Sequence, residues 1–153
     1  MSGTFSHVAM CVSDLERSAT FYEGLGFRRA VRTVHCGSDF AALLEMDDTS
    51  YDALFLRNGA VQLELIEYAL PATIAPGPRA PMNTPALTHV SIMVDDLEEA
   101  CRTVEARRGS VLRHTWTDLG EVDGKPAAVV FTLDPDGIRV ELVQQSVVFE
   151  YET

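Results

Sequence analysis

The sequence has little positive charge and no long apolar run. Its 153 residues contain 12 Lys and Arg against 23 Asp and Glu, which gives a formal net charge of −11. Nucleic acids and anionic membrane surfaces require basic surfaces, so we expect neither as a partner. No apolar run reaches the ~20 residues that span a bilayer, and residues 1–6 lack the pattern of a signal peptide. We therefore expect a cytoplasmic protein.

Cysteine is also scarce, and the three cysteines show neither a CxxC spacing nor the even number of a disulfide framework: Cys11, Cys36 and Cys101. We expect reduced thiols. Only one stretch of the sequence is dense in basic residues, and it is a candidate for binding an anionic substrate: Arg28, Arg29 and Arg32. Such a stretch more often forms a solvated strand face than a binding site.

The apolar content is 46%, with 23% charged residues, as in ordinary soluble globular proteins. A chain of this length can bury one proper core, whereas half of it would be marginal alone. We therefore expect one folding unit that both halves share.

The sequence repeats itself. SHVAMCVSDLE near the start aligns without a gap with THVSIMVDDLE downstream, which pairs His7 with His89. Further on, LELIE and VELVQ pair Glu64 with Glu141. Self-similarity at a long fixed spacing indicates one structural unit used twice.

Each copy predicts a strand, a helix and three more strands. Residues 5–12 alternate in polarity, and residues 14–23 have a helical apolar pattern with an N-cap in Ser13 or Asp14. In the second copy a strand near 90–94 precedes a helix over 97–108. The other predicted strands lie near residues 27–34, 53–57, 61–68, 110–117, 127–133 and 138–145, and a short helix or lid lies within 35–49.

Proline and turn residues divide the chain. Asn58-Gly59, Asp123-Gly124 and Asp136-Gly137 are predicted turns, and PATIAPGPRAPMNTP is a linker. We expect a single domain over 1–153, made of module 1 (1–70), the linker (71–86) and module 2 (87–153).

Each copy places a histidine on its first strand and a glutamate on its last. His7 and Glu64 match His89 and Glu141, and two imidazoles with two carboxylates suit one divalent cation. Zinc, nickel, cobalt, manganese and iron all remain open. A lone histidine on a strand is more often structural, but packing alone would not require one in both copies. A carboxylate within an apolar strand also needs a cation or a donor.

Other polar residues have weaker claims to a role. His35 and His114 have no duplicated counterpart, so we treat them as ordinary surface or loop residues. Gln62 and Gln145 share the strand faces of the glutamates and are candidates for supporting donors, although solvation is the simpler interpretation. Several apolar side chains are equally plausible as pocket walls or core: Phe40, Met46, Tyr51, Phe55, Trp116 and Phe131.

The chain resembles the vicinal oxygen chelate superfamily, and especially its glyoxalase I and methylmalonyl-CoA epimerase branch. The resemblance rests on HVAMCVSDLERSATFYEGLGF, LELIEY with the Pro-containing linker, THVSIMVDDLEEA and DPDGIRVELVQ. It implies an α+β fold in which two tandem βαβββ modules form an open, cavity-enclosing mixed β-barrel around a metal. The implied ligands are His7, Glu64, His89 and Glu141.

The resemblance also implies a reaction. Four ligands are typical of the glyoxalase and epimerase branch, whose shared step is proton transfer next to a carbonyl through a metal-bound enediolate. Glu64 or Glu141 is then the catalytic base, and the substrate is a small molecule. The family also implies a homodimer, with the site formed within one chain or across two.

Two other functions stay open. A metal-dependent dioxygenase or thiol transferase could use the same scaffold, although Glu64 would crowd the open iron positions that an oxygenase needs. A non-catalytic protein that binds a small molecule or drug could leave the four positions without metal. The sequence does not name the substrate.

Overall fold

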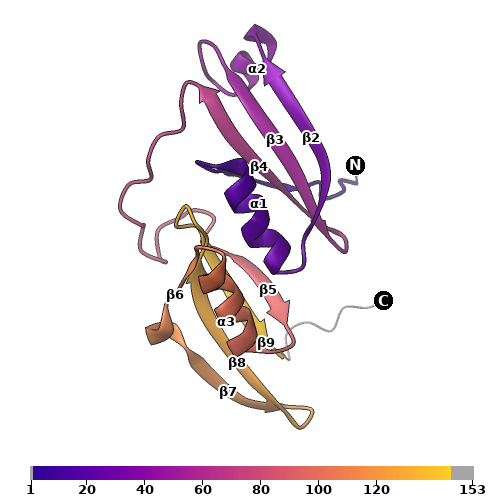
Figure 1. The fold of residues 1–153 in the computed structure, drawn as a ribbon, viewed down its shortest axis with the longest axis vertical. Coiled ribbons are helices and arrows are strands. Elements are labelled where there is room, and N and C mark those ends of the chain that lie inside the picture. The colour runs from indigo at the N-terminus through magenta and orange to yellow at the C-terminus, as the bar shows by residue number, and fades with distance from the viewer. Residues whose placement is uncertain (1, 146–153) are drawn as a thin grey trace. The chain divides into compact units, whose positions relative to one another are not determined.

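The computed structural model describes residues 2–145, with no account of the side chains of Ser38 and Asp39. It divides into two compact units, Met1–Gly77 and Pro78–Thr153, which we call unit 1 and unit 2 (Figure 1). The last residues of the expected second module, 146–153, lie outside the described residues. Each unit has the predicted order of a strand, a helix and then further strands.

Unit 1 is a four-stranded mixed sheet with the strand order β1-β4-β3-β2. The parallel pair β1–β4 makes the first strand of the unit a neighbour of the last, and β2, β3 and β4 pair antiparallel. The elements are β1 (Val8–Cys11), α1 (Leu15–Gly24), β2 (Arg28–Cys36), α2 (Ser38–Leu43), β3 (Ser50–Asn58) and β4 (Val61–Leu70). The expected short helix within 35–49 is α2.

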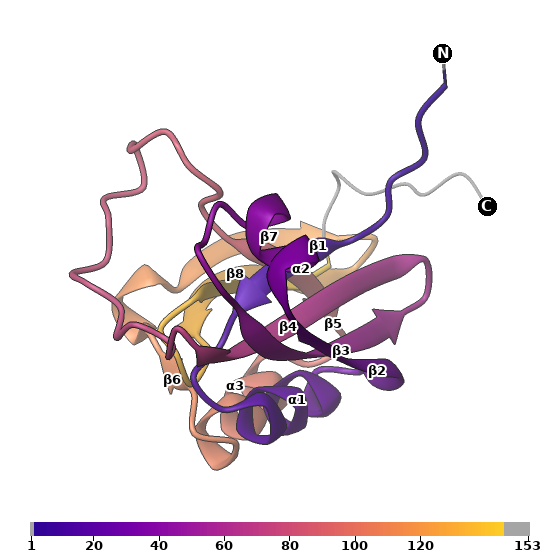
Figure 2. The same ribbon diagram turned by 90° about the horizontal axis from the view of Figure 1, so that it is seen from above.

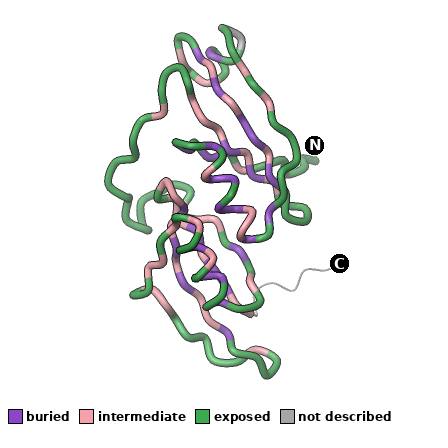
Figure 3. The backbone as a smooth tube through the Cα atoms, viewed as in Figure 1, coloured by how far each residue is buried: buried purple, intermediate pink, exposed green. Residues whose placement is uncertain are grey.

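Helix α1 covers one face of this sheet and forms the core of unit 1 with it (Figure 2). Met10 and Val12 of the first strand segment are buried, as their alternation predicts. The Tyr22 hydroxyl of α1 donates a hydrogen bond to Met10 Sδ at 3.3 Å. Figure 3 shows buried positions along these strands and along α1. Since Leu63 and Leu65 of β4 point into this core, Glu64 between them lies on the face opposite α1.

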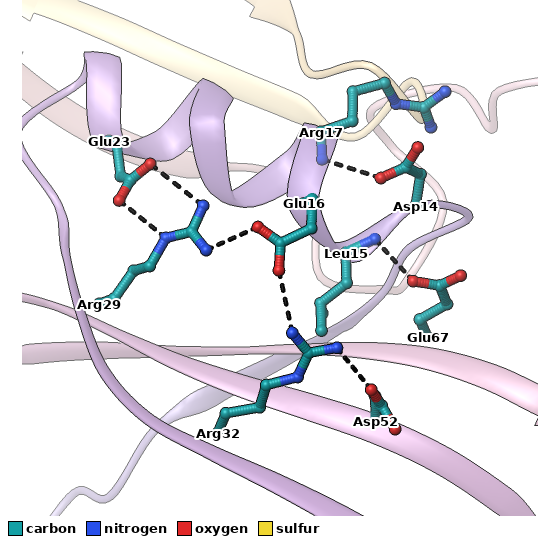
Figure 4. Close-up of polar contacts among 9 residues, drawn as sticks. All are labelled: Asp14, Leu15, Glu16, Arg17, Glu23, Arg29, Arg32, Asp52 and Glu67. Atoms are coloured by element: carbon teal, nitrogen blue, oxygen red, sulfur yellow. Dashed lines mark hydrogen bonds and ion pairs between the residues drawn. The ribbon is translucent and has the colours of Figure 1, made fainter.

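The predicted basic stretch is a network of ion pairs and not an empty anion site (Figure 4). Arg29 contacts Glu23 at 2.9 Å and Glu16 at 2.6 Å, and Arg32 contacts Glu16 at 3.0 Å and Asp52 at 2.6 Å. The hydrogen bonds that Arg29 donates to its acidic partners, first Glu23 and then Glu16, raise the pKa of Arg29. These two guanidinium groups therefore connect α1 to β2 and β3 at the surface.

Unit 2 repeats the plan with a five-stranded sheet in the order β5-β9-β8-β6, and β7 also pairs with β8. Its elements are β5 (Val90–Val94), α3 (Leu97–Ala106), β6 (Ser110–Val111), η1 (Arg113–Thr115), β7 (Thr117–Val122), β8 (Lys125–Leu133) and β9 (Arg139–Gln144). Strands β5 and β9 pair parallel, as β1 and β4 do. Helix α3 packs on β6, β8 and β9.

The predicted strand over 110–117 is wrong as a continuous element. It is broken into β6, the 3-10 turn η1 and the start of β7. The Thr115 hydroxyl donates to the Leu112 carbonyl at 2.8 Å and accepts the Phe131 N–H at 2.9 Å. One side chain thus takes the place of a backbone ladder partner, which the apolar pattern does not reveal.

The proline-rich segment between β4 and β5 has no regular helix or strand and is largely exposed, as Figure 3 shows. Within residues 2–145, none of the helices is both long and apolar enough to cross a membrane. Cys11, Cys36 and Cys101 are not joined by disulfides, as expected, and Cys101 is buried. The described strands form two mixed sheets, one in each unit.

Candidate metal centre

In unit 1 the predicted histidine and glutamate meet. The parallel register pairs Ala9 with Glu64, and His7 lies two residues before Ala9 on the same face of the sheet. His7 Nε2 is 3.1 Å from Glu64 Oε2. The side chains are 34% and 15% exposed, so the pair is reachable from solvent while its carboxylate is largely covered.

Unit 2 forms the equivalent pair. Its register pairs Ser91 with Glu141, and His89 Nε2 lies 3.7 Å from Glu141 Oε2. Ser91 adds a contact that unit 1 lacks, because its hydroxyl donates to the same Glu141 oxygen at 2.7 Å, whereas Ala9 has no hydroxyl. The two pairs therefore share their geometry but differ in how the carboxylate is held.

A hydroxyl next to each histidine contacts its other ring nitrogen, which the sequence analysis did not consider. Ser6 Oγ is 2.8 Å from His7 Nδ1, and Thr88 Oγ1 is 2.9 Å from His89 Nδ1. In the tautomer whose Nδ1–H donates to the hydroxyl, Nε2 keeps its lone pair and faces the glutamate. Hydrogen bonds of this kind orient histidine ligands in metal sites. The hydroxyl that directly precedes the histidine in both copies was the available signal.

A phenylalanine packs beside each pair. The rings of His7 and Phe55 are 5.5 Å apart and nearly perpendicular, and those of His89 and Phe131 are 5.2 Å apart. Each phenylalanine is also the cross-strand partner of the glutamate, since Phe55 pairs with Glu64 and Phe131 with Glu141. The ring lies edge-on to the imidazole and neighbours the glutamate on the same sheet face, and this arrangement is duplicated.

The donor spacing fits a bound cation. Two donors that each lie about 2.1 Å from one ion are separated by about 3.0 to 3.4 Å at octahedral or tetrahedral angles. The separation of 3.1 Å in unit 1 falls within this range, and 3.7 Å in unit 2 is slightly longer. Among the described residues, no group of three or more His, Cys, Asp and Glu side chains forms a metal-binding cluster, so each pair is a two-donor set.

The remaining predicted polar residues lie elsewhere or have other partners. His114 is exposed in η1, as expected, whereas His35 lies in β2 and is half-buried against aromatic rings. Gln62 shares the face of Glu64 but accepts a hydrogen bond from Arg57 Nε at 2.8 Å. Gln145 follows the end of β9. The structure records no contact between these two glutamines and a histidine–glutamate pair within the described part of the chain.

Comparison with solved structures shows the fold class of the protein. The structure resembles a glyoxalase family protein from Bacillus cereus with a TM-score of 0.77 and 18% identity over 92% of both chains. It also resembles a fosfomycin resistance protein from Listeria monocytogenes, solved with Mn(II) and sulfate, with a TM-score of 0.59 and 11% identity over 96% of both chains. At these identities the likeness shows the fold alone, which is that of two modules of mixed strands with few helices.

Comparison of the sequence with family models shows the family of the protein. The model of the Glyoxalase/Bleomycin resistance protein/Dioxygenase superfamily matches residues 4–142, so the chain belongs to this superfamily. A lactoylglutathione lyase from Salmonella typhimurium is 28% identical over 90% of both chains. The predicted family and α+β fold are confirmed.

Proposed function

We propose that His7, Glu64, His89 and Glu141 together bind one divalent cation, and that the protein is a metal-dependent lyase or isomerase of the glyoxalase or epimerase type. Its reaction is proton transfer next to a carbonyl group of a small molecule, through an enediolate. The cation is zinc, nickel, cobalt, manganese or iron.

The observation that carries this proposal is the duplicated spacing of the donors. In each unit a histidine Nε2 and a glutamate Oε2 from the first and last strands lie 3.1 or 3.7 Å apart on the same sheet face. The likeness to lactoylglutathione lyases over 90% of the chain supports this branch of the superfamily. The fosfomycin resistance protein with the same fold was solved with Mn(II), which agrees with a divalent cation.

The cation and the surrounding residues have different roles in the proposed reaction. When bound, the cation supplies a Lewis acid that polarises the substrate carbonyl. Glu64 or Glu141 accepts the proton from the adjacent carbon and returns it to the product. His7 and His89 remain ligands, oriented by Ser6 and Thr88. Phe55 and Phe131 lie beside the glutamates as their cross-strand partners.

Two measurements on the full chain test the proposal. Elemental analysis of gently purified protein should find about one of these metals per chain, consistent with a four-ligand site. Incubation in D₂O with hemithioacetals of 2-oxoaldehydes, made with several thiols, and with 2-substituted acyl-CoA esters should place deuterium on the carbon next to the carbonyl of at least one compound. Glu64→Gln and Glu141→Gln should each slow this exchange by ~10²- to 10⁴-fold.

Gln62→Ala is the matched control, because Gln62 shares the face of Glu64 but contacts Arg57. It should leave exchange within about twofold of the original rate. Protein that binds the compounds without holding metal or exchanging hydrogen would contradict the proposal in favour of a non-catalytic binding protein. Oxygen uptake with catechols in the iron-loaded protein would favour a dioxygenase.

The homodimer and the cytoplasmic location remain predictions.

A further inference from the structure

Four rings gather on unit 1 on the face opposite α1, and we call them the aromatic quartet: His35, Phe40, Tyr51 and Tyr68. The His35 ring stacks on Tyr51, with centroids 4.8 Å apart and an angle of 28° between the planes. Phe40 of α2 lies 4.4 Å from His35, and Tyr68 lies 5.4 Å from Tyr51. Helix α2, which joins β2 to β3 (Figure 1), brings Phe40 to this end of the sheet.

The quartet shares its sheet face with the His7–Glu64 pair. Glu64 and Tyr68 are four residues apart on β4 and therefore point the same way, about 13 Å apart along the strand. Tyr51 is the cross-strand partner of Tyr68. Burial raises the pKa of both Tyr51 and Tyr68, and the charge of Glu64 acts in the same direction on each phenol. The rings thus lie within electrostatic reach of the candidate metal centre.

The described part of unit 2 has no such group, although it repeats the histidine, the glutamate and the phenylalanine. Tyr51 lies four residues before Phe55, and the residue four before Phe131 is Ala127. Gly120 pairs with Ala127 where His35 pairs with Tyr51, and Gln145 stands where unit 1 has Tyr68. Strands β7 and β8 are joined by a turn, with no counterpart of α2. The quartet therefore does not belong to the part of the fold that both copies need.

The quartet is only partly covered. Tyr51 at its centre is 7% exposed, but Phe40 is 37% exposed, and His35 and Tyr68 are half-buried. Within the described part of the chain, neither the Tyr51 nor the Tyr68 hydroxyl has a hydrogen-bond partner. With their raised pKa values, both phenols stay protonated and can donate to a ligand.

We propose that the aromatic quartet binds a flat, uncharged aromatic portion of the substrate while the carbonyl portion lies at the His7–Glu64 pair. The proposal rests on the proposed function for the placement of the carbonyl and defines the substrate class as aryl-bearing carbonyl compounds. An aromatic group suits the quartet because offset and edge-on ring contacts add to apolar burial. An uncharged group suits it because burial, the main cause of the raised pKa values of Tyr51 and Tyr68, disfavours charge at this place.

The test measures 2-naphthol binding to the full chain by NMR titration, with and without prior removal of metal by a chelator. Tyr68→Gln installs the residue that unit 2 carries at the equivalent position, and it should weaken binding at least fivefold in both preparations. Tyr68→Phe keeps the ring and should stay within about threefold of the original affinity. Val34→Gln is the matched control, since Val34 is an exposed apolar residue of β2 on the opposite face.

Phe40→Ala provides a second variant, because Phe40 is the most exposed ring of the quartet and its loss leaves Tyr51 in place. It should also weaken 2-naphthol binding severalfold, with an unchanged circular dichroism spectrum. Binding that is absent, or that Tyr68→Gln and Phe40→Ala leave unchanged, overturns the aromatic site even if the protein holds metal and exchanges hydrogen. Binding that depends on Tyr68 in a protein without metal or exchange supports the aromatic site and contradicts the proposed function alone.

Discussion

At the scale of single residues, the two halves of the candidate centre differ at the position next to the glutamate. Ser91 donates to Glu141 Oε2, whereas Ala9 at the equivalent register position cannot. A hydroxyl that donates to a carboxylate fixes the rotamer of that carboxylate before a cation arrives. Glu141 is therefore the better oriented of the two glutamates.

This difference predicts the effect of Ser91→Ala. The variant should fold normally, because unit 1 already carries Ala at this position. It should bind the cation about 10-fold more weakly, as is typical when a residue that orients a ligand is lost. Competition with a fluorescent chelator at fixed pH measures the affinity.

The reciprocal variant is the control for this prediction. Ala9→Ser should leave metal affinity unchanged or improve it, because it gives Glu64 the donor that Glu141 has. Equal metal affinity of Ser91→Ala and the unmodified protein would show that the 2.7 Å contact does not orient the ligand.

Sequence reasoning found those residues of the candidate centre that are identical in both copies. His7, Glu64, His89 and Glu141 stood out because both copies carry them, and the structure brings each histidine to its glutamate. Whether the two pairs share one cation stays a prediction. Ser6 and Thr88 were missed because the comparison of the two copies relied on identical residues. Serine and threonine differ in type, although both hydroxyls contact the histidine Nδ1.

At the scale of elements, both helices begin with the same pair of contacts. Asp14 and Asp96 are the N-caps, and each accepts the N–H of the residue three positions on. The first N–H of each helix goes to the last strand of the unit: Leu15 donates to Glu67, and Leu97 donates to Gln144, both at 2.8 Å. The start of each helix is thereby bonded to the strand that carries the candidate glutamate ligand.

The hydrogen bond from the Leu15 N–H to Glu67 predicts the outcome of two substitutions at Glu67. Glu67→Leu leaves the Leu15 N–H without its acceptor in a half-buried place and should reduce the free energy of unfolding by about 1–3 kcal/mol. Glu67→Gln keeps an acceptor oxygen, as Gln144 does in unit 2, and should cost less than about 1 kcal/mol. Urea denaturation followed by circular dichroism compares them, and equal losses for the two variants would contradict the role of the acceptor.

Elements that the copies share were predictable, and elements that only one copy has were less so. The aligned stretches gave β1 with α1 and β5 with α3, because the alternation and the helical pattern occur twice. The region over 110–117 has no such support from the first copy. Its break depends on the Thr115 hydroxyl, a tertiary contact with β8 that no local pattern encodes.

At the scale of the whole molecule, the two pairs can act together or separately, and metal stoichiometry decides between these cases. If all four side chains share one cation, titration should reach a plateau at about one ion per chain and raise the melting temperature, since the ion binds only folded protein. If each pair acts separately, the plateau lies at two.

Histidine variants complete this prediction. His7→Ala and His89→Ala should each lower metal affinity by at least about 100-fold when the site is shared, because either loss removes one of four ligands. His114→Ala is the control, since His114 is exposed in η1 and far in sequence from both pairs. Loss of only half of the bound metal in either ligand variant would contradict a shared site.

The repeated histidine–glutamate pair also bears on how such a chain could arise. A protein of half this length, associated with a second copy of itself, would already carry all four donors. Fusion of two such genes would require no new ligand residue. It would also leave the halves free to differ, and one half of this chain has rings and an extra helix where the other has glycine, alanine and glutamine at the corresponding places.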